Sequence, residues 1–249
     1  MIHSRSFETA GAAPSSTGSA ERSVEVAATE WIFGRVADGN KLPVAEAECV
    51  VNVLYTEGAW GGRVVLPPLS VADPSVFLSV HAVNVATLAM ALARLQQFDP
   101  PSIRSVGLAA LLHNVGMARI SAEVWRKQGK LTPEEREMVK RHPVEGAILL
   151  LATHDSLDLA AVVAYEHHLR MDGSGYPKLT YARSAHFVSR LVQVCDVFCA
   201  LSADRPYRKA WPVDVILSFL DERSGFEFHP TIAATLTTLV RDDLALATI

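Results

Sequence analysis

Apolar stripes at helical spacing run through most of this chain and leave few folds open to it. The pair Asp73-Pro74, an N-cap aspartate followed by proline in the first turn, typically starts a helix. The stripe behind it, with members three or four residues apart, consists of Phe77, His81, Val85, Leu88 and Leu92. No segment alternates apolar and polar residues as a half-buried strand would. The sequence therefore predicts an all-α fold with short irregular loops, in which this stripe is buried.

Other helices follow from the same reasoning. An earlier stripe at Val50, Val51 and Leu54 is broken by the glycines and prolines of residues 58–68. The motif Thr132-Pro133-Glu134-Glu135 predicts a capping box with proline at the first helical position. Pro143 predicts a break or kink after His142. The remaining helices are expected over residues 103–115, 157–168, 187–203, 213–223 and 230–240.

Composition along the chain suggests three regions. Residues 1–23 are rich in Ser, Thr, Ala and Gly, which predicts a flexible tail, and no apolar signal-peptide core follows Arg5. Residues 24–72 are expected to form a small N-terminal helical region and residues 73–249 the main domain. The small region either packs against the main domain or acts as a sensory or dimerising cap, so a homodimer is left open.

The overall composition excludes several classes of protein. Aliphatic, aromatic and cysteine residues make up 49% of the 249 residues and charged residues 20%, which excludes a disordered chain. Arg94, Arg190 or Asp196 interrupts the longest apolar runs, so no membrane span is expected. A net charge of −4 argues against a broad nucleic-acid-binding face. Three cysteines without CxxC spacing favour a reducing cytoplasm.

Histidines are the candidates for a functional site. Five of the nine lie in or at the end of apolar helical segments, namely His81, His113, His142, His167 and His168. A single histidine on such a face is usually a core or surface residue. Five on four segments favour a metal site, because one metal takes ligands from several elements. Asp196 lies in the apolar run 191–198, where an unpaired carboxylate is costly, so a metal or Arg190 is expected to supply a cation.

A series of short motifs extends from His81 to Trp211. His113-Asn114 is followed by motifs at residues 129–135 and 140–143, and then by the paired histidines and Asp172-Gly173-Ser174-Gly175-Tyr176-Pro177. Further motifs lie at residues 195–198 and 204–210. Together they resemble the motifs of the HD-GYP family, metal-dependent phosphodiesterases that open the bacterial second messenger cyclic di-GMP. The resemblance covers roughly half of the chain and implies the helical fold of the HD superfamily.

The resemblance also implies roles for individual residues. It implies a centre of iron (Fe) or manganese (Mn), with ligands at His81, His113, His142, His167, His168 and Asp196. It places ligand-contacting arginines at Arg205 and Arg208, whose planar guanidinium groups suit phosphate or guanine edges. In the GYP loop, Asp172 is followed by a tight turn that depends on Gly173, Gly175 and Pro177. Tyr176 is either presented to the site or is only a turn residue.

Several residues depart from the family pattern on its catalytic side. Asn114 stands where the family has an aspartate that bridges the metals, and a neutral amide oxygen binds such cations weakly. Met117 stands where the family has a lysine that helps to hold substrate phosphate. Further departures are Leu169 and Cys199 in place of acidic residues, Phe77 in place of a glutamate ligand, and a loop without its usual glycines at residues 178–182. One or two ions, weakly held or absent, are therefore expected.

These departures favour a degenerate HD-GYP domain in bacterial cyclic di-GMP signalling. Such a domain would bind cyclic di-GMP or a related nucleotide, or dock onto signalling proteins through its GYP face, with weak or lost hydrolysis. One alternative is a working cyclic di-GMP phosphodiesterase, and another is an HD-type phosphohydrolase acting on a different nucleotide. Since the chain is acidic overall, a local cluster of metal, Arg205 and Arg208 would have to attract a doubly negative nucleotide.

Overall fold

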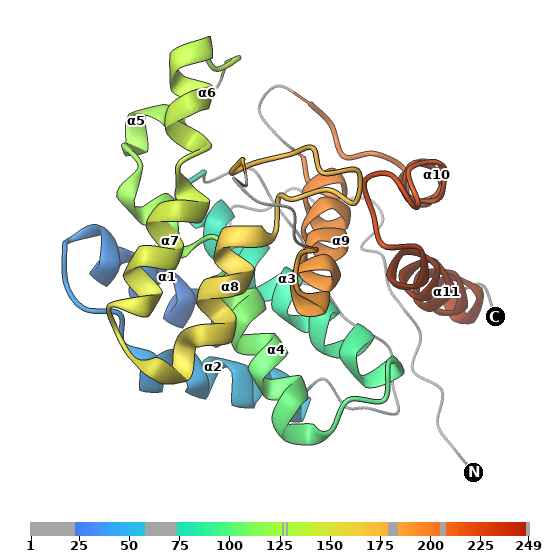
Figure 1. Cartoon of the computed structure of the whole chain (residues 1–249). Coiled ribbons are helices and arrows are strands. Elements are labelled where there is room, and N and C mark those ends of the chain that lie inside the picture. The colour runs from blue at the N-terminus through green and yellow to red at the C-terminus, as the bar shows by residue number, and fades with distance from the viewer. Residues whose placement is uncertain are drawn as a thin grey trace, which may run out of the picture.

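The computed structural model describes residues 23–57, 74–125, 127, 129–178, 184–204 and 208–247, and this part of the chain is helical without strands (Figure 1). The helices are α1 (Val24–Ala37), α2 (Val44–Glu57), α3 (Pro74–Leu95), α4 (Pro100–Leu112), α5 (Ala122–Trp125), α6 (Pro133–Val139), α7 (His142–Leu151), α8 (Asp158–Glu166), α9 (Phe187–Leu201), α10 (Val213–Glu222) and α11 (Pro230–Ala247). Two short 3₁₀ helices, η1 (Val115–Arg119) and η2 (Asp155–Leu157), lie among them. The expected all-α fold is confirmed.

Side-chain caps explain where several helices begin. The hydroxyl of Thr132 accepts a hydrogen bond from the Glu135 backbone N–H at 3.2 Å. The Glu135 carboxylate accepts one from the Thr132 N–H at 2.7 Å, which completes the predicted capping box of α6. Asp99 caps α4 by accepting from the Ser102 N–H at 2.8 Å. These helix starts are therefore set by interactions between residues close in sequence.

Two helix boundaries near the site differ from the prediction. The helix expected over residues 103–115 begins at Pro100, because Asp99 caps it and prolines fit its first turn. It ends at Leu112, which leaves His113 at its C-cap. The break expected after His142 lies before that residue, because Pro143 occupies the first turn of α7, where its missing N–H costs no helical hydrogen bond.

The later helices differ from their predicted spans mainly at their C-terminal ends. The helix expected over residues 157–168 begins after η2 and ends at Glu166, so the paired histidines follow it. α9 ends at Leu201 rather than 203, α10 at Glu222 rather than 223, and α11 continues to Ala247 rather than ending at 240. Apolar spacing predicts the body of a helix, whereas its last residues depend on caps and tertiary contacts.

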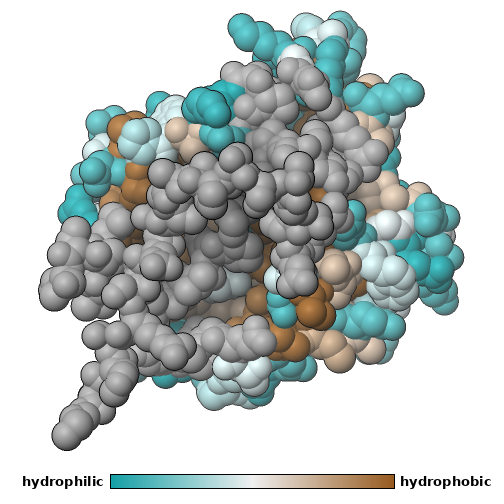
Figure 2. Space-filling model, turned by 180° about the vertical axis from the view of Figure 1, so that it is seen from behind, coloured by the Kyte–Doolittle hydropathy of each residue, from teal (hydrophilic) through white to brown (hydrophobic). Residues whose placement is uncertain are grey.

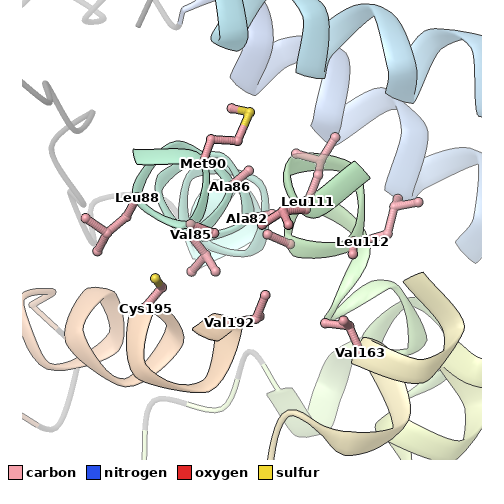
Figure 3. Packing of buried hydrophobic residues seen from close by; sticks show 14 of the residues in the cluster. Ala82, Val85, Ala86, Leu88, Met90, Leu111, Leu112, Val163, Val192 and Cys195 are labelled. Carbon is pink, nitrogen blue, oxygen red and sulfur yellow. The ribbon is translucent and has the colours of Figure 1, made fainter. Parts of the chain in front are cut away.

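α3 lies at the centre of the hydrophobic core. It packs against α4 and α9, and α1 also contacts it. Figure 3 shows Val85 of α3, Leu111 and Leu112 of α4, Val163 of α8 and Val192 of α9 in one apolar cluster. The core therefore joins α3 and α9, which contain His81 and Asp196, with α4 and α8, which are followed by His113 and by the paired histidines.

The central helix also has the length and hydropathy of a membrane span, over Val76–Leu95. However, 78% of that segment is buried inside the protein, as is usual for a core helix. Phe77, which was expected to be buried with the stripe, is only half-buried. It lies near the start of the helix, where its ring stacks on His81 with centroids 5.6 Å apart.

The predicted N-terminal region contributes α1 and α2 to the same core. Ile32 and Val36 of α1 and Val50 of α2 are buried in one cluster with residues of α3 and α4. The predicted flexible tail lies outside the described residues except for Ser23, which caps α1, and residues 58–73 also lie outside them. The boundary between a small region and a main domain stays a prediction.

Apolar side chains also reach the surface. Figure 2 shows hydrophilic residues over much of the described rim on the face opposite to that of Figure 1, with hydrophobic patches between them. Large exposed apolar side chains include Trp31 of α1, Ile148 and Leu151 of α7, and Met171 and Phe226 in loops. The last two come from adjacent segments, because the Asp172 N–H donates to the Phe226 carbonyl at 2.8 Å.

Candidate metal centre

Five helices bring the six predicted ligands together, and His81 and Asp196 lie within α3 and α9. His113 and His167 directly follow α4 and α8, and His142 opens α7. Their ligand atoms form two groups, each with all atoms within 4.8 Å of one another: His81, His113 and Asp196, and His142, His167 and His168. The rings of His113 and His167 have centroids 5.1 Å apart, so the two groups adjoin. Five of these side chains are buried and that of His168 is half-buried.

Backbone carbonyls orient three of the histidine rings. In each ring Nδ1 lies within hydrogen-bond distance of the carbonyl oxygen three residues earlier. The pairs are His113 with Ala110 at 2.6 Å, His142 with Val139 at 2.7 Å and His167 with Ala164 at 2.9 Å. All three carbonyls belong to last turns of helices, which lack intrahelical partners. Since a carbonyl only accepts, Nδ1 carries the proton and Nε2 presents a lone pair to the centre.

The facing nitrogens fit a metal ion. His142 Nε2 and His167 Nε2 lie 3.3 Å apart, and each is the unprotonated nitrogen of its ring. Two nitrogen ligands at ~2.1 Å from one metal, at about the tetrahedral angle, are roughly 3.4 Å apart. In the other group, His81 Nε2 lies 2.8 Å and His113 Nε2 3.8 Å from Asp196 Oδ1. Imidazole with one carboxylate suits divalent transition metals such as iron, manganese or zinc.

The protonation states also suit a cation. Burial, followed by the neighbouring histidines, lowers the pKa of His142 to about 3, and burial lowers the pKa of His168 to about 4. Both rings are therefore neutral at pH 7 and able to bind metal. Burial by itself would raise the pKa of Asp196, but its interactions with the histidine group, which include the 2.8 Å contact with His81, outweigh burial and hold that pKa well below its usual range.

Arg190 is not the cation of Asp196, although the sequence left that pairing open. Its guanidinium donates to the backbone carbonyl of Leu169, and Gln193 Nε2 donates to the same oxygen at 2.9 Å. Asp196 instead pairs with His81. The buried carboxylate thus lies in the histidine group, where it could serve as a metal ligand.

Asn114 contacts one of the ligands directly. Its Nδ2 lies 2.8 Å from His113 Nε2, where an amide donates to the nitrogen lone pair. This contact uses the same lone pair that a metal would use. Met117 lies nearby on η1 with its side chain buried and adds no charge to the centre.

Gly116 allows η1 to approach α7 closely. A Cβ atom at this position would lie 2.0 Å from the His142 carbonyl oxygen and 2.5 Å from the Gly146 nitrogen, distances that real Cβ atoms do not show. Only glycine fits without moving one of the two segments. This contact keeps the His113-Asn114 pair beside the start of α7, which carries His142.

The GYP loop folds back onto His168. Gly175 has a φ of 93°, and a Cβ there would lie 2.1 Å from the His168 carbonyl oxygen. Asp172 stabilises the turn by accepting from the Ser174 N–H at 2.8 Å, and Gly173 also has positive φ. Tyr176 is joined to Pro177 by a cis peptide bond. The centroid of its ring lies 4.5 Å from that of the His168 ring. The described loop therefore presents Tyr176 beside the centre.

The two arginines expected to contact a nucleotide differ in what can be said of them. Arg205 lies outside the described residues. Arg208 donates to the carbonyls of Ala200 at 2.8 Å and Leu201 at 3.2 Å, at the C-terminal end of α9. Its guanidinium also lies 5.8 Å from the centre of the Trp211 ring. A contact with a nucleotide stays a prediction, and the geometry adds a helix-capping role that the sequence did not suggest.

Glu166 is a buried residue of the site that the sequence analysis missed. Its carboxylate accepts from the His186 N–H at 2.7 Å and from the Ser189 hydroxyl at 2.9 Å. The available signal was a glutamate at the apolar end of a predicted helix, directly before the paired histidines. A buried carboxylate in such a place needs hydrogen-bond donors from another element.

Comparisons with known proteins bear on this geometry. A model of the HD domain family matches residues 68–232. The chain is 32% identical over 206 residues to cyclic di-GMP phosphodiesterase PA4108 of Pseudomonas aeruginosa, a match that covers 83% of this chain and 50% of that protein. It is 40% identical over 129 residues to the cyclic di-GMP phosphodiesterase response regulator RpfG of Xanthomonas campestris, covering 51% of this chain and 34% of that protein. The chain thus spans half or less of these curated relatives.

A solved structure shares the fold. Bd1817, an HDG"Y"P protein from Bdellovibrio bacteriovorus, matches with a TM-score of 0.63 at 18% identity, covering 87% of this chain and 69% of that one. Similarity at this low identity shows the arrangement of helices and not the chemistry.

Proposed function

This chain belongs to the HD-domain family, in its HD-GYP branch. From that premise we propose that it binds cyclic di-GMP or a related nucleotide at a metal centre. We propose further that its phosphodiesterase activity is weakened or lost. We propose that the chain acts as a regulatory or binding domain in cyclic di-GMP signalling, in the bacterial cytoplasm. The six ligands would hold one or two divalent ions. An ion bound there would polarise a phosphodiester and activate water.

The contact between Asn114 and His113 carries this proposal. The amide N–H lies 2.8 Å from the ligand nitrogen, so the side chain competes with a metal rather than offering it a charge. A carboxylate at this position would contribute two anionic oxygens and offset the charge of the ions. An amide contributes one neutral oxygen to a metal, and it can do so only after its N–H turns away from His113. The second ion should therefore bind most weakly.

The surroundings of the centre support binding more than turnover. Tyr176 lies beside His168 and offers an aromatic face to a nucleotide. The buried Met117, three residues after Asn114, provides no cation for phosphate. Substrate charge would have to be met by the metal ions and by arginines of the 204–210 segment, such as Arg208.

One observation favours the alternative of a working cyclic di-GMP phosphodiesterase. All six ligands are assembled, and the proton positions of three histidines suit metal binding. A second alternative, hydrolysis of another nucleotide by the same centre, would need the same ligands. The two alternatives and the proposal therefore differ in turnover and substrate rather than in fold.

A signalling protein that docks on the GYP face belongs to the same proposal. The exposed side chains of Met171 and Phe226 lie on neighbouring segments of that face. Paired aspartates, Met171→Asp with Phe226→Asp, should remove such docking while leaving nucleotide binding intact. Analytical ultracentrifugation of the same variant tests whether the face instead forms a homodimer.

The deciding experiment compares the wild-type chain with the double variant Asn114→Asp/Met117→Lys. Both are expressed with excess iron or manganese, and metal content is measured by elemental analysis. Cyclic di-GMP binding is measured by calorimetry and its hydrolysis by chromatography, with His167→Ala as the control lacking a ligand. We expect the wild type to bind nucleotide with little hydrolysis, and the double variant to gain both metal and turnover.

Each outcome decides between the alternatives. Wild-type hydrolysis as fast as that of the double variant would overturn the proposal in favour of a working phosphodiesterase. Hydrolysis of only another nucleotide in a substrate screen would support the alternative of an HD-type phosphohydrolase with a different substrate. A wild-type chain that takes up neither metal nor nucleotide would overturn all three.

A further inference from the structure

A carboxylate outside the proposed ligand set joins α8 and α9, two of the helices that position the ligands. Glu166, the last residue of α8, is 1% exposed, and its Oε2 atom accepts both from the His186 N–H and from the Ser189 hydroxyl of the α9 N-terminus. The first N–H groups of a helix lack intrahelical partners and attract anions. Glu166 is thus held at the start of α9 by an arrangement that suits its charge.

A second connection lies on the other side of the paired histidines. The carbonyl oxygen of Leu169 accepts hydrogen bonds from Arg190 and from Gln193, both buried side chains of α9. A buried arginine normally pairs with an acid or donates to several acceptors, because its desolvation is costly. Here it donates to the backbone directly after His167 and His168. The dipeptide is therefore attached to α9 at both ends.

The two attachments connect the two ligand groups. His167 and His168 belong to one group, and Asp196, farther along α9, belongs to the other. We infer that Glu166 is a positioning residue, which together with the Leu169 carbonyl sets the spacing between the two groups of ligands. This inference rests on the proposed metal binding. It concerns a residue that lies outside both groups of ligand atoms.

The inference predicts different effects for two substitutions of Glu166. Glu166→Ala leaves the His186 N–H and the Ser189 hydroxyl without their acceptor and frees the end of α8. Loss of a residue that orients metal ligands typically weakens metal binding by roughly 10–100-fold, and we expect a loss in that range. Glu166→Gln should lose much less, because one oxygen accepts both hydrogen bonds and an amide oxygen can replace it. Ser189→Ala, which removes a single donor, should lie between them.

The test titrates Mn²⁺ into chelator-treated variants of the 249-residue chain by calorimetry and records their thermal unfolding. Gln96→Ala is the matched control, because it removes another tertiary hydrogen bond, from Nε2 of Gln96, directly after α3, to Thr235 Oγ1 of α11 at 2.9 Å. It should lower the melting temperature without changing Mn²⁺ affinity. If Glu166→Ala does not fold, Glu166→Gln and Ser189→Ala supply the comparison. Wild-type affinity in a folded Glu166→Ala or Ser189→Ala variant would overturn the inference.

A second measurement separates this inference from metal binding itself. In metal-free protein labelled with ¹⁵N-histidine, long-range NMR correlations report which ring nitrogen carries the proton. Wild-type His167 should show the Nδ1–H form, because Nδ1 faces the Ala164 carbonyl. Glu166→Ala should mix the two forms. A wild type that takes up no Mn²⁺ would defeat the proposed function, whereas unchanged His167 signals in Glu166→Ala would defeat the positioning role.

Discussion

Replacing Asn114 by aspartate tests the reasoning about the metal centre most directly. The amide nitrogen of Asn114 lies 2.8 Å from His113 Nε2, so it donates to a lone pair that a metal would need. Aspartate cannot donate at neutral pH and brings a second carboxylate to a centre that already holds Asp196. The substitution therefore removes a competitor and adds negative charge in a nearly isosteric side chain.

The size of the effect follows from charge and burial. A carboxylate and a unit positive charge about 4 Å apart attract by ~4 kcal/mol at an effective dielectric constant of ~20. Asn114 is half-buried, and desolvation of the new charge offsets much of this gain. A net gain of ~1–3 kcal/mol remains, which is roughly a 5–150-fold increase in metal affinity. Without metal the substitution should lower the stability of the folded protein, because the new carboxylate faces the lone pair of His113 and the charge of Asp196.

The assay measures Mn²⁺ affinity and melting temperature with and without metal, for wild type, Asn114→Asp and Asn114→Ala. We expect Asn114→Asp to melt lower than wild type in chelator and higher in Mn²⁺. Asn114→Ala removes the amide without adding charge and so separates the two contributions. Unchanged metal affinity and stoichiometry in Asn114→Asp would refute the reasoning.

Four other predictions concern the same region. His167→Ala should remove one ion per chain, measured by elemental analysis, because it leaves its group with two ligands. Gly116→Ala should destabilise the protein by about 3 kcal/mol, or roughly 6–12 °C in melting temperature, because its Cβ would lie 2.0 Å from the His142 carbonyl oxygen. The metal-free protein should lose stability as the pH falls below about 6.5, measured by urea unfolding. The pKa values of His142 and His168 are lowered to about 3 and about 4 in the folded protein. The unfolded chain therefore takes up these protons first as the pH falls, and unfolding becomes more favourable. Arg208→Ala should cost about 1 kcal/mol of stability, measured by thermal unfolding, because its guanidinium caps the end of α9.

Each of these predictions has an outcome that contradicts it. Wild-type metal content in His167→Ala would mean that the ring is not a ligand. A Gly116→Ala variant as stable as wild type would show that η1 can move away from α7. A urea midpoint that does not fall between pH 7 and pH 5 would contradict the neutral buried histidines, and His142→Gln should flatten the pH dependence. If Arg208→Ala keeps full stability but loses nucleotide affinity, the arginine acts on the ligand rather than on α9.

Prediction from sequence succeeds here where the interactions are local. The capping box of Thr132 and Glu135 involves residues three positions apart, so their residue types are enough to predict it. Helix ends were less accurate, as at Leu112 and Glu166, because the terminal carbonyls take partners from histidine rings or neighbouring segments. The chain can leave the helix wherever such partners exist.

The candidate ligands illustrate the same division. The resemblance of the sequence motifs to the HD-GYP family predicted the six ligands and marked Asn114 as a departure from the family pattern. The division into two groups of three depends on packing, because His81 and Asp196 are 115 residues apart and meet only when α3 packs against α9. The same packing decided that Arg190 bonds the Leu169 carbonyl rather than Asp196.

The sequence by itself determined that the chain is helical, where most helices run and which side chains have metal-binding chemistry. Only the tertiary structure decided which of these side chains share a group, which ring nitrogen faces the centre and which buried charges support it, as for Glu166. The physical reason is the distance along the chain over which each kind of interaction acts. Caps and apolar periodicity act within about one helical turn, whereas the position of a ligand atom depends on how distant helices pack.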